Sequence, residues 1–156
     1  IPEGLLQNMG KYELPYISFD DSLAMAKAGQ PWEDPTNPKK DFLRELRIEV
    51  ADALGIGQDE EALERLHIYT AVGSPLDVFH KIDFFVEYEQ KDGHILRVTC
   101  DLTEDPARKK NMGDILVIDA NALGDPANDE KRYLDAISGL AQNIARNFRS
   151  QESRFN

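Results

Sequence analysis

Two segments of the chain alternate between apolar and polar residues with the period of a β-strand. They are Ile82 to Glu89 and Ile95 to Thr103, and Lys91-Asp92-Gly93 lies between them. Such alternation on both sides of a glycine-containing loop predicts a β-hairpin. A three-residue loop with Gly93 in the left-handed conformation sets the register of the two strands. This register pairs Phe84 with Cys100, Val86 with Val98, Tyr88 with Leu96 and Glu87 with Arg97. It keeps one face of the hairpin apolar, which a slip of one residue would not do.

Two longer segments have the period of an amphipathic helix. The first runs from Asp41, a good N-cap residue, to Leu54, and Gly55 follows as a stop signal. Four of its apolar residues, Phe42, Leu46, Val50 and Ala53, fall within an arc of about 80°, and Glu49 lies about 20° outside that arc. The second covers residues 129 to 148, whose apolar positions also share one face. Shorter helices are predicted at 20–27 and 59–65, a helical turn after Ser74-Pro75, and strands at 66–72 and 115–119, the last in the sheet interior.

This order of elements predicts an α/β (α+β) fold, with a small mixed central β-sheet that contains the hairpin and is flanked by helices. Residues 1–40 contain five of the eight prolines in the chain and are expected to form an N-terminal arm. Tyr16, Phe19 and Trp32 are the residues expected to anchor it. Residues 41–156 are expected to form a single α/β domain.

Composition excludes several classes of protein. The chain has 156 residues, with 18 Lys and Arg against 29 Asp and Glu, so its formal net charge of -11 argues against a general nucleic-acid coat protein. No apolar run approaches the roughly 18 residues of a membrane span, and no signal peptide is recognisable. The single cysteine, Cys100, excludes a disulfide framework and a cysteine-rich zinc site. A cytoplasmic protein is expected.

The hairpin register places Asp83 directly across from Asp101. Their Cβ atoms would then lie about 5 Å apart, and like charges facing each other across two strands are destabilising. A divalent cation, a shared proton or a nearby arginine would offset the repulsion. If the helix at 41–54 packs on this face, Glu49 would supply a third carboxylate to a Mg²⁺ or Mn²⁺ site. The alternative is that both aspartates simply protect exposed strand ends.

The order helix, strand, strand, strand, with these acids at these positions, resembles the PD-(D/E)XK nuclease superfamily. Three stretches carry the resemblance, which covers roughly residues 41 to 148: the helix around Glu49, the segment from His80 to Phe85, and the segment from Val98 to Thr103. It implies a restriction-endonuclease-like core and Mg²⁺- or Mn²⁺-dependent hydrolysis of DNA phosphodiester bonds. Asp83 and Asp101 would bind the metal, and Glu49 would assist as a ligand or a base.

The sequence departs from the family pattern at two positions of the motif. Ile82 stands where the motif has proline, and Thr103 stands where it has the catalytic lysine. Lys109 or Lys110 would therefore replace that lysine, with Lys81 a weaker candidate. Only residues 104–111 are available for the helix that the family places before its fourth strand.

Three function classes follow from these residues. The first is a metal-dependent nuclease-like enzyme, whose DNA would reach the site over a local basic rim of Arg97, Arg108, Lys109 and Lys110, with Arg146, Arg149 and Arg154 contributing from the C-terminal end. The second is a catalytically inactive, protein-binding or accessory domain on the same fold, favoured by Thr103 and by the acidic composition. The third, a zinc hydrolase, would need His80 in the same pocket as Asp83.

Overall fold

A four-stranded mixed β-sheet forms the centre of the molecule. The computed structural model describes residues 15–30, 33–109 and 113–155, and leaves out the side chains of residues 108, 109 and 155. The strands are β1 (Leu66–Thr70), β2 (Phe84–Glu89), β3 (Ile95–Thr103) and β4 (Leu116–Asp119), and they lie in the order β1-β2-β3-β4. The first three form an antiparallel meander, and β4 runs parallel to β3.

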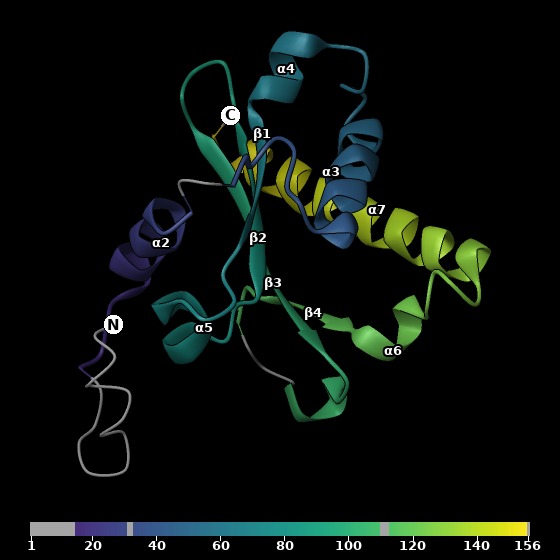
Figure 1. The fold of residues 1–156 in the computed structure, drawn as a ribbon. Helices are drawn as coiled ribbons and strands as arrows, with labels where there is room; N and C mark the ends of the chain where they lie inside the picture. The colour runs from purple at the N-terminus through teal and green to yellow at the C-terminus, as the bar shows by residue number, and fades with distance from the viewer. Residues whose placement is uncertain (1–14, 31–32, 110–112, 156) are drawn as a thin grey trace.

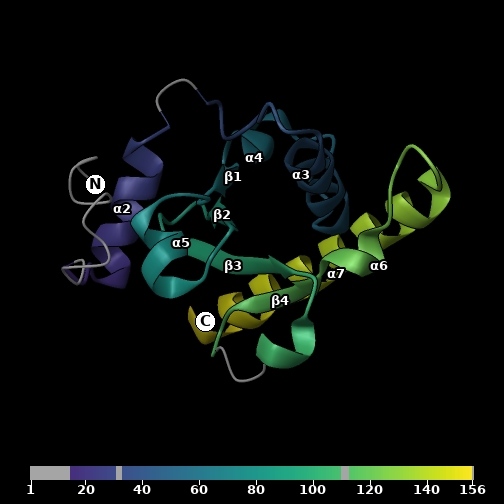
Figure 2. The ribbon, with the colours of Figure 1, turned by 60° about the horizontal axis from the view of Figure 1, so that its bottom comes forward.

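Helices cover both faces of this sheet (Figure 1). Helices α3 (Asp41–Ala53) and α7 (Glu130–Phe155) pack on one face, while α2 (Phe19–Ala28) and α5 (Pro75–His80) pack on the other (Figure 2). The short elements are α4 (Glu60–Glu64), η1 (Pro106–Lys109) and α6 (Ala120–Leu123). The predicted α/β class, with a small mixed sheet between helices, is therefore confirmed.

The hairpin has the predicted register. Phe84 faces Cys100, Val86 faces Val98 and Glu87 faces Arg97. Gly93 has a φ of 92°, the left-handed conformation that the three-residue loop requires and that costs glycine little. Because side chains alternate across a strand, Phe84 and Cys100 point towards α3 and α7, whereas Phe85 points towards α2 and α5.

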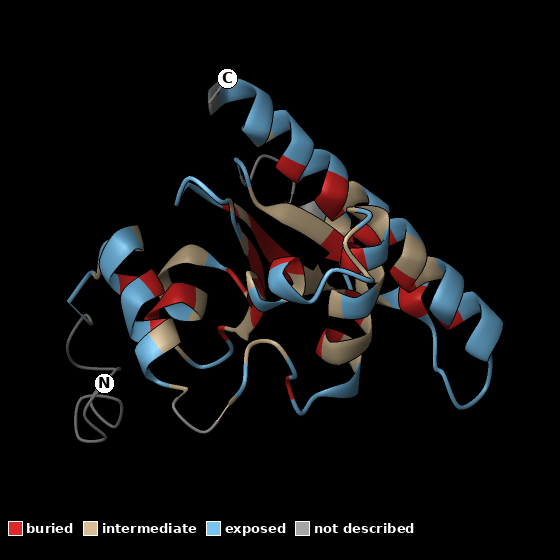
Figure 3. Ribbon diagram, turned by 90° about the horizontal axis from the view of Figure 1, so that it is seen from above, coloured by how far each residue is buried: buried red, intermediate tan, exposed pale blue. Residues whose placement is uncertain are grey.

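Two hydrophobic clusters hold the layers together, and buried residues line both sides of the sheet (Figure 3). The larger lies between the sheet and helices α3 and α7, and Leu46, Val50, Ile137 and Ile144 are fully buried in it. The smaller lies between the sheet and helices α2 and α5, around the fully buried Phe85. Each cluster buries apolar side chains on a different face, so the sheet is the wall between them.

Three details differ from the predicted elements. Strand β4 is an edge strand of the described sheet rather than an interior one. Helix α7 continues seven residues beyond Phe148 because the polar segment that follows contains neither Gly nor Pro. The N-cap of α3 is Lys40, and Asp41 is the first residue of the helix. The carboxylate of Asp41 pairs with Arg44 and complements the helix dipole.

The segment before α2 is held to α5 by aromatic contacts. The ring of Tyr16 lies 5.8 Å from that of Phe79 and 5.7 Å from that of His80, and Phe19 lies 5.7 Å from His80. Phe19 packs against the smaller hydrophobic cluster, as an anchor should, whereas Tyr16 makes these ring contacts while it is 72% exposed; Trp32 lies outside the described residues. None of the described helices is both long and apolar enough to cross a membrane.

Candidate functional site

Asp83 is fixed at the point where three strands meet. It lies immediately before β2, its backbone N–H donates to the Cys100 carbonyl at 2.8 Å, and its own carbonyl accepts from the Ala71 N–H at 2.7 Å. Its side-chain Oδ2 accepts a hydrogen bond from the Leu102 N–H at 2.7 Å. The carboxylate therefore takes the place of a backbone acceptor beside β3, and its position is set by the sheet.

The carboxyl group of Asp101 lies against that of Asp83. Asp101 is only 2% exposed, and it points to the α5 side of the sheet because its neighbour Cys100 points to the α3 side. Burial raises the pKa of Asp83, and the hydrogen bond and negative charge of Asp101 raise it further, against the lowering effect of the Leu102 N–H. The negative charge of Asp77, on α5, adds to the increase in this pKa.

The contact between the two carboxyl groups favours the binding of either a proton or a cation. Two ionised carboxylates in contact repel each other, so a proton shared between them or a positive ion relieves the repulsion. The donor set fits Mg²⁺, which usually binds through one or two carboxylates and keeps several waters. Within the described part of the chain, no group of three or more His, Cys, Asp or Glu side chains is placed to hold a metal ion.

Glu49 does not join the two aspartates. It lies on α3, whose buried residues belong to the same cluster as Phe84 and Cys100. The side chain of Asp101 is on the opposite face of the sheet, so the condition under which Glu49 would become a third ligand is not met. The physical reason is that α3 buries its apolar face against the apolar side of the hairpin, and the carboxylates occupy the other side.

The position of the motif lysine is taken by a neutral residue. Thr103 is the last residue of β3 and faces Asp119 of β4. Lys109 belongs to η1, but its side chain is not described, and Lys110 lies outside the described residues. Lys81 is exposed and has a φ of 60°, a left-handed conformation that ends α5 two residues before Asp83. The replacement of the lysine by Lys109 or Lys110 stays a prediction.

His80 and Cys100 have other roles. The Nε2 atom of His80 lies 3.0 Å from the Ile17 carbonyl, and its ring packs between aromatic side chains of the N-terminal segment. This arrangement ties His80 to the N-terminal segment rather than to Asp83. Cys100 is fully buried in the larger hydrophobic cluster, on the apolar face of the hairpin, and this burial raises the pKa of its thiol.

A buried ion-pair cluster lies on the same face as the aspartates, at the other end of the hairpin. Glu87 is 4% exposed and accepts from Lys27 Nζ and Arg97 Nε, both at 2.6 Å. The predicted pair of Glu87 and Arg97 is present, and Lys27 joins it from α2. The guanidinium of Arg97, a member of the predicted basic rim, thus lies against Glu87, and its charge is offset by this carboxylate.

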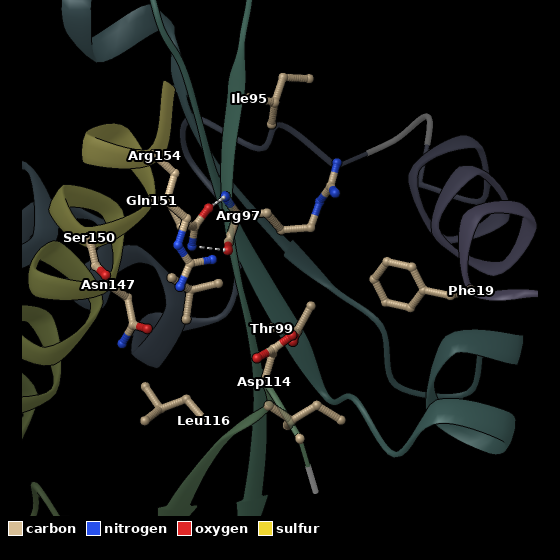
Figure 4. A pocket seen from close by; sticks show the side chains of 13 residues that line it. Phe19, Ile95, Arg97, Thr99, Asp114, Leu116, Asn147, Ser150, Gln151 and Arg154 are labelled. Carbon is tan, nitrogen blue, oxygen red and sulfur yellow. Dashed lines mark hydrogen bonds between the residues drawn. The ribbon is translucent and has the colours of Figure 1, made fainter. Parts of the chain in front are cut away.

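A cleft of about 580 Å³ lies at the edge of β3, beside the C-terminal part of α7 (Figure 4). Polar residues of α7, the first half of β3 and the start of β4 line it, together with Phe19. The sequence reasoning missed this cleft and also missed Asp77. In the sequence, the cleft is indicated only by the polar segment that continues α7 beyond Phe148. No local pattern shows that this segment lies beside β3.

Comparisons with protein-family models, with curated proteins and with solved structures give no match to this chain.

Proposed function

We propose that Asp83 and Asp101 bind a divalent cation, Mg²⁺ or Mn²⁺, and that the protein is a metal-dependent nuclease-like enzyme acting on phosphodiester bonds of DNA. The observation that carries this proposal is the contact between the two carboxyl groups at the adjoining ends of β2 and β3. The meander of β1 to β3 with a parallel β4 supports it, since the resemblance to PD-(D/E)XK nucleases implies the same arrangement of acids on neighbouring strands.

The chemistry would follow from the charges of the pair. When bound, a divalent cation lowers the pKa of a coordinated water and stabilises negative charge on a phosphoryl oxygen. Asp83 and Asp101 would hold the ion, and the Leu102 N–H would fix the orientation of the Asp83 carboxylate. Because a proton and a cation compete for the same carboxylates and the pKa of Asp83 is raised, affinity would fall as the pH is lowered.

A second candidate function is a catalytically inactive, partner-binding domain on the same fold. Two observations favour it: Thr103 occupies the position of the motif lysine, and Glu49 lies on the far side of the sheet. Such a domain would keep the pair of aspartates but would not cleave DNA.

Cleavage of supercoiled plasmid DNA in Mg²⁺ or Mn²⁺ tests the proposal. The wild type should cleave, Asp83→Asn and Asp101→Asn should not, and Asp135→Asn, an exposed control on α7, should behave as the wild type. Thr103→Lys, which restores the motif residue, should increase the rate. If all variants, including Thr103→Lys, leave the plasmid intact, the nuclease function is wrong and the second candidate replaces it.

A further inference from the structure

The first half of β3 has an edge that β4 does not cover. Pairing of β4 with β3 begins at Cys100, opposite Leu116, and continues to Thr103. Before Leu116 the chain turns at Gly113, which has a φ of 67°, and at Asp114. The described part of the chain therefore gives Ile95 to Thr99 no neighbouring strand on this side, although β2 pairs with them on the other.

A side-chain amide occupies this edge in place of a strand. The backbone N–H of Arg97 donates to Oε1 of Gln151 at 3.0 Å, and Nε2 of Gln151 donates to the Arg97 carbonyl at 2.7 Å (Figure 4). A primary amide offers one acceptor and donors in the same plane, as a peptide group does. This pair of bonds is the one that facing residues of two antiparallel strands exchange. Gln151 thus marks a position that suits an extended peptide backbone.

The cleft around this edge has the size and lining of a peptide-binding groove. Its volume of about 580 Å³ lies within the usual range of ligand sites, about 300 to 1,000 Å³. One wall is a polar stripe at helical spacing on α7, made of Asn147, Ser150, Gln151 and Arg154. Phe19 and Ile115 supply apolar surface, and Ile95 is 42% exposed. Backbone pairing on one side and side-chain pockets on the other are the features of strand addition.

The charges of the groove indicate what the peptide carries. The guanidinium of Arg97 is bound to Glu87, and Asp114 lies near Thr99, at the other end of the groove from Gln151. Arg154 is exposed beside Gln151, and within the described residues its guanidinium has no hydrogen bond or ion pair. An acidic side chain at this end would therefore meet a cation.

We propose that the groove binds an extended peptide segment of another protein, which adds to the edge of β3 between Ile95 and Thr99. The peptide displaces the Gln151 amide from Arg97 and places an acidic side chain beside Arg154. This surface is separate from the Asp83–Asp101 pair, and the proposal does not depend on cation binding or hydrolysis.

Titration of the ¹⁵N-labelled protein with the acetylated, amidated peptide Gly-Thr-Val-Asp-Val-Thr-Gly, followed by NMR, tests this proposal. Shifts should centre on Ile95 to Thr99 and on α7 from Asn147 to Arg154. Gln151→Ala removes the internal competitor and should tighten binding about three- to tenfold, whereas Gln142→Ala, an exposed control on α7, should not. Arg154→Glu should weaken binding about fivefold, and Arg146→Glu, its control, should have little effect.

A peptide that carries N-methyl groups at alternate residues keeps its side chains but loses backbone N–H donors. Its titration into the wild-type protein therefore distinguishes backbone pairing from side-chain contact. It should not bind, because methylation removes the donors that face Arg97. Equal binding of both peptides, no shift at about 1 mM peptide, or shifts centred elsewhere would overturn the proposal. An oligothymidylate that shifts the same residues and displaces the peptide would overturn it in favour of a nucleic-acid groove.

Discussion

Replacing Asp83 by asparagine removes one of two facing negative charges while it keeps the shape of the side chain. The amide oxygen of asparagine can still accept the hydrogen bond from the Leu102 N–H, which Asp83 Oδ2 accepts at 2.7 Å. The substitution therefore isolates the electrostatic cost of the pair from its packing. We expect Asp83→Asn to stabilise the metal-free protein at neutral pH.

The magnitude follows from Coulomb's law. For two carboxylates in contact, at a charge separation of about 4 Å, the repulsion is about 4 kcal/mol at an effective dielectric constant of about 20 and about 1 kcal/mol in bulk water. Asp83 is partly exposed and Asp101 is buried, so the free energy of unfolding should rise by about 1 to 4 kcal/mol. Asp135→Asn, on the exposed surface of α7, should change it by less than about 1 kcal/mol.

The pH dependence gives this prediction a sign. The folded-state pKa of Asp83 is raised above its ordinary value of 3.8, so the folded protein binds more protons than the unfolded chain between these two pKa values. The contribution of Asp83 to stability is therefore fully present below about pH 3.8 and is lost as the pH rises through the raised pKa. The stability advantage of Asp83→Asn over the wild type should therefore grow as the pH rises through the raised pKa of Asp83.

Urea unfolding in EDTA, measured from acid to neutral pH on wild type, Asp83→Asn and Asp135→Asn, is the assay. Added Mg²⁺ at about 100 times its Kd should stabilise the wild type by about 2.7 kcal/mol and leave Asp83→Asn unchanged. An Asp83→Asn protein that is less stable than the wild type at every pH would refute the like-charge reasoning.

Three further substitutions test the smaller hydrophobic cluster, the buried ion pairs of Glu87 and the conformation of the hairpin loop. Phe85→Ala should lower the free energy of unfolding in urea by about 3 to 5 kcal/mol, because the buried ring stacks on Tyr69 at 4.9 Å between the sheet and α2. Glu87→Gln should lower the free energy of unfolding by about 2 to 4 kcal/mol, because Lys27 and Arg97 lose their buried partner. A loss below about 0.5 kcal/mol would show that water solvates the two cations instead. Gly93→Ala should destabilise the protein by about 1 kcal/mol and lower its melting temperature, because Gly93 has a φ of 92°. Gly139→Ala, in the helix α7, should raise the melting temperature instead, since a Cβ there meets no other atom. Equal effects of the two substitutions would contradict the backbone argument.

The hairpin could be predicted from the sequence because local and non-local signals agree there. Only one register of the two strands buries Phe84 and Cys100 on one face, and Gly93 supplies the loop conformation that this register needs. The proximity of Asp83 and Asp101 follows from that register.

The elements that the sequence did not place correctly depend on contacts between distant segments. The apolar run of β4 is compatible with an interior or an edge position, since its composition does not report how many strands adjoin it. Glu49 sits at the border of an amphipathic helix, and which face of the sheet that helix covers is decided by the apolar side of the hairpin. The bonds between Gln151 and Arg97 join residues 54 positions apart, and no periodicity relates them.

The measurement that tests the central claim most directly is isothermal titration of the protein with Mn²⁺. Wild type should bind, and Asp83→Ala, Asp101→Ala and the double variant should each lose that binding, while circular dichroism shows that they remain folded. Absence of binding in the wild type, or equal binding by the alanine variants, would contradict the assignment of the Asp83–Asp101 pair as a cation site.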